Sequence, residues 1–169
     1  MTGMTRIVVA LVLSLGVLVG WAAPSSARAD EELTTRQARA LYQDVTCDVG
    51  AARTRYNNRV FGPDNWITIA EVRRRLSELR DLAWTMSLAE ARAARRLYHA
   101  PAAWPAEVVD EIDTVVDYRI RASNVLNQMS GANSAVRFIE LGKKANKMGP
   151  GRAPDRIRVY LSVPVYPRG

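Results

Sequence analysis

The sequence predicts an all-α protein: an up-down bundle of three long helices, with a shorter fourth helix and a packed C-terminal tail. Three stretches carry apolar residues at steps of three or four, the spacing that lines one side of a helix. Turns containing proline or glycine separate these stretches. The chain has a single cysteine, so no internal disulfide can form and packing alone must hold the bundle.

The N-terminal segment, residues 1–29, predicts a cleaved signal peptide. A basic start ending at Arg6 precedes the apolar run Ile7–Val19, which is too short for a comfortable membrane span. Ala27-Arg28-Ala29 supplies the small residues that a signal peptidase reads. Cleavage after Ala29 removes two arginines and no acid, which lowers the net charge of +7 by two. We expect a secreted or envelope-associated protein with no transmembrane span after cleavage; the alternative is an uncleaved anchor.

The first bundle helix is expected to begin near Thr35. Thr34 and Gln37 have the spacing of a capping box, in which two side chains satisfy free backbone N–H groups. A turn at Phe61–Asp64 should end the helix, with Asp64 or Asn65 capping the next one. The apolar stripe of the first helix consists of Ala38, Leu41, Val45, Val49, Ala52, Tyr56 and Val60.

The second helix is expected over Trp66–His99, as one continuous helix. Its apolar stripe contains one misfit, Glu90. The alternative is a break near Ser87, because Ser87 and Glu90 also fit a capping box. The stripe consists of Val72, Leu76, Leu79, Ala83, Met86, Glu90, Ala93 and Leu97.

The third helix should open at Pro105, after a turn over residues 100–105, and end at Gly131. Its stripe also contains a charge, Arg119. A short turn makes the second and third helices antiparallel neighbours, and a buried charge needs a partner. We therefore predict an interior ion pair between Glu90 and Arg119. The third-helix stripe consists of Val108, Ile112, Val115, Arg119, Ala122, Leu126 and Met129.

A fourth helix is expected over Asn133–Lys147, and Gly149-Pro150-Gly151 ends it. This places the bundle at residues 30–148 and the tail at residues 149–169. Residues 156–163 alternate as a strand would, but no second strand is available to satisfy the backbone. We therefore favour a short helix opening at Pro154.

Cys47 lies away from the apolar stripe of the first helix, among the small residues Ala40, Ala51 and Thr54. A strip of small residues often receives another segment closely, so we expect the C-terminal part of the chain to cover Cys47. The alternative is an exposed thiol that forms an intermolecular disulfide in an oxidising compartment and links a self-associating bundle.

Two short patches carry a resemblance. Leu41-Tyr42 followed by Cys47, together with the ending Arg156–Pro164, resembles small exported all-helical proteins of high-GC Gram-positive bacteria, which are mostly of unknown function. The resemblance implies export and an all-helical fold, and it implies no active site.

Candidate catalytic groups are few. His99 is the only histidine, and its place at a helix end beside a proline favours a solvated residue. Trp66 and Trp104 are interpreted as core residues. Gly-rich phosphate loops and nucleophile motifs are absent from the sequence, so we expect no cofactor, no metal and no enzyme activity. The alternative is a small hydrolase that uses carboxylates near the start of the third helix: Glu107, Asp110, Glu111, Asp113 and Asp117.

The positive charge indicates an interaction surface. No stacking aromatics or recognition motif accompany the basic residues, which disfavours nucleic acid as a partner. We expect a non-enzymatic interaction protein of the cell envelope, whose partner is an anionic envelope polymer or another exported protein. The candidate surface consists of Arg73, Arg74, Arg92, Arg95, Lys143, Lys144 and Lys147.

Overall fold

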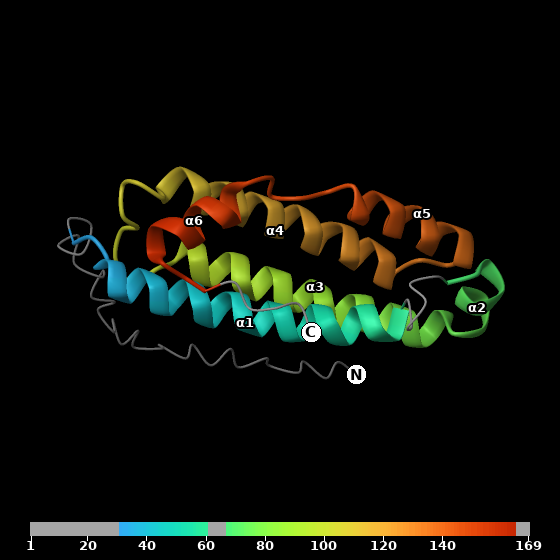
Figure 1. Cartoon of the computed structure of the whole chain (residues 1–169). Coiled ribbons are helices and arrows are strands. Elements are labelled where there is room, and N and C mark those ends of the chain that lie inside the picture. The colour runs from blue at the N-terminus through green and yellow to red at the C-terminus, as the bar shows by residue number, and fades with distance from the viewer. Residues whose placement is uncertain (1–30, 61–66, 165–169) are drawn as a thin grey trace, which may run out of the picture.

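Three long helices lie side by side and define the molecule. The computed structural model describes residues 31–60 and 67–164, and within them the elements are helices. Figure 1 shows α1, α3 and α4 running lengthwise, with α6 near one end and α2 and α5 near the other. The predicted all-α bundle is therefore confirmed. The elements are α1 (Thr35–Val60), α2 (Ile69–Arg74), α3 (Leu76–Tyr98), α4 (Val109–Ser130), α5 (Ala135–Asn146) and α6 (Ala153–Leu161). The predicted signal peptide, the turn at 61–64 and Trp66 lie outside the described residues.

Helix α1 begins where its sequence predicts. The Thr34 hydroxyl oxygen accepts the Gln37 N–H at 3.3 Å, and the Gln37 side-chain oxygen accepts the Thr34 N–H at 2.9 Å. This reciprocal capping box satisfies N–H groups that the first turn leaves free. Just before it, the Leu33 N–H donates to the Ala103 carbonyl at 2.8 Å, which ties the chain to the α3–α4 turn.

The predicted continuous second helix is wrong, and so is the alternative break at Ser87. The chain leaves helical geometry at Arg75, between α2 and α3, and α2 turns to pack against α5. Thr68 caps α2 by accepting the Glu71 N–H at 3.2 Å, and the caps expected from the sequence, Asp64 or Asn65, lie outside the described residues. Ser87 is buried inside α3, and its hydroxyl donates to the Ser123 carbonyl at 3.0 Å.

Side-chain bonds at Arg75 account for the position of the break. Its guanidinium donates to the Arg59 carbonyl at 2.6 Å and to Glu78 at 2.9 Å, so it joins the end of α1 to the α2–α3 junction. Val72 and Leu79 on either side are both fully buried. The apolar spacing therefore continues across the break, and periodicity cannot reveal it.

Helix α4 begins later than expected. Pro105 precedes a turn in which the Val108 N–H donates to the Pro105 carbonyl at 2.9 Å, and the helix begins at Val109. It ends at Ser130 with Gly131 as its C-cap, as predicted. Trp104 in the preceding turn is buried, and its indole N–H donates to the Leu97 carbonyl at 2.9 Å. The interpretation of Trp104 as a core residue is therefore confirmed.

The tail is helical, as expected. Residues 153–161 form α6, with Pro154 in its first turn, and the left-handed residue Ser162 ends it at φ 52°. The helix packs on α4 and α1. Arg39 of α1 donates to the Leu161 carbonyl, so the tail reaches α1 near its N-terminal end.

Cys47 is exposed, so the expectation that the C-terminal segment covers it is wrong. Helix α6 contacts α1 near Arg39 and Tyr42, on the stripe that faces the core. Cys47 lies further along α1 and outside that stripe, so a nine-residue helix docked at its start does not reach it.

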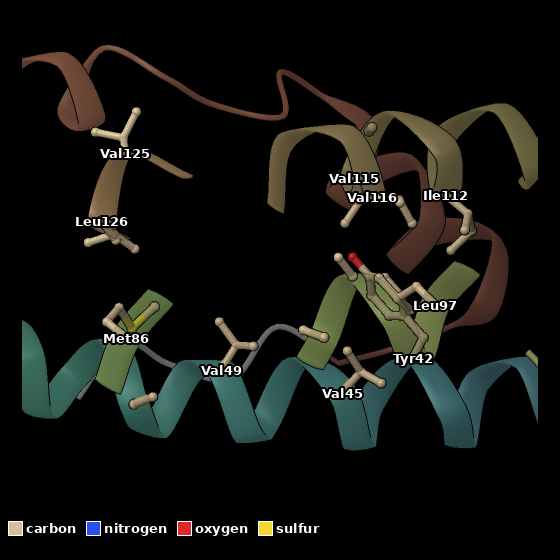
Figure 2. Close-up of a cluster of buried hydrophobic side chains, with 14 of the residues drawn as sticks. Tyr42, Val45, Val49, Met86, Leu97, Ile112, Val115, Val116, Val125 and Leu126 are labelled. Atoms are coloured by element: carbon tan, nitrogen blue, oxygen red, sulfur yellow. The ribbon is translucent and has the colours of Figure 1, made fainter. Parts of the chain in front are cut away.

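The core fills the space between the three long helices. Figure 2 shows Tyr42 rising from α1 toward Leu97 of α3 and Ile112 of α4. All three are at most 1% exposed. Val49 and Met86 continue this packing between α1 and α3. Burial of these side chains supplies the main stabilisation, at ~25 cal/mol per Å² of apolar surface.

Candidate functional site

The basic residues singled out from the sequence are all exposed, and they lie on three different elements. Arg73 and Arg74 lie on α2, while Lys143 and Lys144 lie on α5 with Lys147 at its C-cap. Arg92 and Arg95, on α3, border different hollows: Arg92 faces α1, whereas Arg95 lies beside α4 with Tyr98 and His99. The structure thus divides the predicted surface among three elements.

Only one of these residues, Arg92, borders the groove on the α1 side of α3. This groove, of about 420 Å³, lies between the antiparallel helices α1 and α3. Small or branched apolar side chains line it: Val45, Val49, Ala52, Ala89 and Ala93. Three arginines, Arg55, Arg92 and Arg96, border it together with Asp48 and Thr85. We call it the α1–α3 groove.

The α1–α3 groove has unneutralised positive charge. Arg96 is held by α1, because it donates to Asp48 at 3.2 Å and also to Asp44, and the bond to Asp44 raises the pKa of Arg96. Arg55 and Arg92 make no ion pair with any described residue. Two guanidinium groups are therefore available to an anion.

Arg55 and Arg96 were not among the residues predicted from the sequence. Both are exposed arginines in a chain with many of them, and nothing in their own spacing marks them. Their position beside Arg92 follows from how α1 docks on α3. Once that docking is known, the stripe of small residues Ala52, Ala89 and Ala93 indicates where the two helices leave a groove.

Glu90 and Arg119 meet in the interior, as the stripe misfits predict. Arg119 Nη1 donates to Glu90 Oε2 at 2.7 Å, and their side chains are 8% and 1% exposed. A third residue joins them: Arg53 Nη2 donates to Glu90 Oε1 at 2.6 Å and to the Tyr118 hydroxyl at 3.2 Å. Each carboxylate oxygen of Glu90 thus accepts from a different arginine.

Of the carboxylates near the start of α4, Asp110 and Glu111 border one hollow of about 320 Å³, and Glu107, Asp113 and Asp117 do not. Glu107 accepts a hydrogen bond from the Tyr160 hydroxyl at 3.0 Å, and Glu111 forms an ion pair with Arg156 at 3.0 Å, so both fasten α6. The hydrogen bond to Glu107 raises the pKa of Tyr160. Asp113 and Asp117 are exposed. Among residues 31–60 and 67–164, His, Cys, Asp and Glu form no group of three that could hold a metal ion.

His99 is exposed at the C-cap of α3, with its ring edge-on to Tyr98 at 4.9 Å between centroids. His99 borders a hollow together with Arg95 and Ser123, and no carboxylate of the described residues lines that hollow. None of the helices that the structure describes is both long and apolar enough to cross a membrane. No protein-family model, curated protein or solved structure matches this chain.

Proposed function

We propose that the protein is an exported, non-enzymatic binding protein of the cell envelope, which holds an anionic polymer in the α1–α3 groove. The observation that carries this proposal is the pair Arg55 of α1 and Arg92 of α3, which both border the apolar floor of the groove and have no ion-pair partner among the described residues. A polyanion supplies charge to both guanidinium groups, while its carbon backbone contacts the floor.

The shape of the groove favours an extended ligand. It follows the line between two long antiparallel helices, and the floor residues span about two turns of α1, from Val45 to Ala52, and about one turn of α3, from Ala89 to Ala93. The side chains at the floor are short, so a linear chain can approach the helix backbones closely. Arg96, fixed by Asp44 and Asp48, borders one end as an oriented donor.

The test is retention on immobilised poly(glycerol phosphate), a polyanion with one charge per repeat. We expect the protein to be retained at low salt and released steeply as salt rises, because exposed charges are screened beyond ~8 Å at physiological ionic strength. The double variant Arg55→Gln/Arg92→Gln should elute at much lower salt.

A charge-matched control separates the groove from general basicity. Arg73→Gln/Arg74→Gln removes the same charge from exposed residues of α2, outside the α1–α3 groove. It should elute close to the original protein. Equal weakening of both double variants would contradict a groove site and leave only net charge as the cause.

Export is part of this proposal and has its own test. The small residues before Asp30 indicate cleavage there, so the intact mass of material from the culture medium should correspond to a chain that begins at Asp30. A mass that retains residues 1–29 would contradict cleavage and favour an anchor.

The exposure of Cys47 supports a second candidate function, a self-associating bundle linked through this thiol. In an oxidising compartment an exposed thiol forms an intermolecular disulfide. A non-reducing gel of the exported protein should then show a dimer that Cys47→Ser abolishes, and a monomer under those conditions would contradict this candidate.

A further inference from the structure

A second cleft lies on the other flank of the α1–α3 contact. Arg53 and Asn57 of α1 border this cleft. Each residue of a helix turns ~100° about the axis, so these two residues lie about 150° around α1 from Asp48 and Arg55, which border the α1–α3 groove. Helices α4 and α5 form its other walls. This cleft shares no residue with the α1–α3 groove and does not depend on the function proposed above.

The cleft consists of two adjoining hollows with different chemistry. An ionic end of about 220 Å³ is bordered by Arg53, Glu90 and Tyr118. An apolar end of about 230 Å³ is bordered by Val60, Met129, Phe138, Ile139 and Gly142, with Lys143 as its one charged lining residue among those described. The two ends share the lining residues Tyr56, Leu126, Ala145 and Asn146. Together they fall within the ~300–1,000 Å³ typical of small-molecule sites.

The ionic end carries one surplus positive charge. Glu90 contributes one negative charge, and Arg53 and Arg119 contribute two positive charges. Burial acts to lower the pKa of Arg53, but the charge of Glu90 and the hydrogen bond to it outweigh burial and raise that pKa. Arg53 therefore stays charged; its side chain is 46% exposed and borders the cleft.

The network also leaves a buried donor unsatisfied. Arg119 Nε is inaccessible and has no hydrogen-bond partner among the described residues. Buried donors without partners are rare in folded proteins, and each one calls for an explanation such as a bound molecule. Arg119 is not among the residues that border the cleft, so its free Nε is not offered to a ligand there; the surplus charge, presented by Arg53, is what favours an anion at this end.

The walls suit a flexible apolar body. Met86 and Met148 border the ionic end and Met129 borders the apolar end, so every methionine in the described residues lies on this cleft. Methionine adapts its shape to apolar ligands and is frequent at adaptable binding surfaces. Burial raises the pKa of Tyr56 to about 12, so the phenol at the junction of the two ends stays neutral at physiological pH.

We propose that this cleft binds a single-chain amphiphilic carboxylate, with the carboxylate at Arg53 and Tyr118 and the alkyl chain extending past Leu126 toward Phe138. A carboxylate carries one charge and matches the single surplus charge of the network. The planar guanidinium of Arg53 has further N–H groups that fit a carboxylate. A phosphate monoester would bring a second negative charge close to Glu90, which disfavours it.

The test compares decanoate with decanol by calorimetric titration of the purified protein. The two probes share a ten-carbon chain and differ in the charged group. We expect decanoate to bind about 10-fold more tightly or better, as a charge-assisted hydrogen bond implies. Equal affinity, or no binding of decanoate at millimolar concentration, would overturn the proposal.

Two variants locate the ligand within the cleft. Arg53→Gln leaves Glu90 paired with Arg119, so the fold is kept, and it should abolish the preference for decanoate over decanol. Gly142→Leu should weaken both probes, because the new side chain enters the apolar end. A Cβ at position 142 makes only ordinary contact with Met129, at 3.6 Å, so Gly142→Ala is the matched control and should bind as before.

A direct readout completes the experiment. The methyl NMR signals of Met86, Met148 and Met129 should shift when decanoate is added, and Arg55→Gln/Arg92→Gln should leave these shifts unchanged. If decanoate binds but these three signals do not move, the ligand lies elsewhere and the proposed cleft is wrong.

Discussion

At the scale of single residues, Glu90 is the polar centre of the core. Its carboxylate is 1% exposed and accepts hydrogen bonds from Arg53 and Arg119, which come from α1 and α4. Desolvating a charge is costly, and the two bonds compensate for that cost. Because Glu90 itself belongs to α3, one side chain joins all three long helices and fixes how they rotate against one another.

Removal of this carboxylate should be strongly destabilising. Glu90→Ala leaves the buried Arg119 without a counter-charge, so we expect the free energy of unfolding to fall by about 3–5 kcal/mol in chemical denaturation. The double variant Glu90→Leu/Arg119→Met removes both buried charges and should recover most of the loss. A single variant within about 1 kcal/mol of the original protein would contradict a buried, mutually dependent pair.

The sequence predicts part of this network and not the rest. Glu90 and Arg119 stand out because each interrupts an apolar stripe, and the short turn between their helices makes them neighbours. Arg53 interrupts no stripe. It lies on the polar side of α1, where arginine is ordinary, and only the docking of α1 on α3 brings it to Glu90.

At the scale of elements, some helix ends are determined by residues next to them in the sequence, and others depend on a contact with a different helix. The capping box of α1 is local, because Thr34 and Gln37 bond to each other, and its sequence pattern predicts it. The break at Arg75 depends on the Arg59 carbonyl, which belongs to a different helix. Local pattern can predict the first kind of end but not the second.

The capping box gives a test at this scale. Thr34→Ala removes the acceptor for the Gln37 N–H, so the free energy of unfolding should fall by about 1 kcal/mol. Thr54→Ala, an exposed position within α1, is the matched control and should have little effect or stabilise slightly, because alanine favours helix. Equal effects of the two substitutions would contradict a specific role for the cap.

At the scale of the whole molecule, apolar periodicity predicts the bundle because every long helix must bury one stripe. Clefts depend on what the helices leave unfilled between them. Arg55 and Arg96, which border the α1–α3 groove, come from two helices far apart in the sequence. The composition therefore indicates that a surface will be basic, but it does not show where on the fold that surface lies. Lys143 and Arg73 look equivalent to Arg92 in the sequence, and only the fold separates them.

Protection of individual arginines tests the central claim most directly. The protein is treated with phenylglyoxal, which modifies exposed guanidinium groups, with and without poly(glycerol phosphate), and modification at each residue is followed by mass spectrometry. We expect the polymer to slow modification of Arg55 and Arg92 and to leave Arg73 and Arg74 unchanged, because only the first pair borders the α1–α3 groove. Equal protection of both pairs, or none at Arg55 and Arg92, would contradict a polyanion site in this groove.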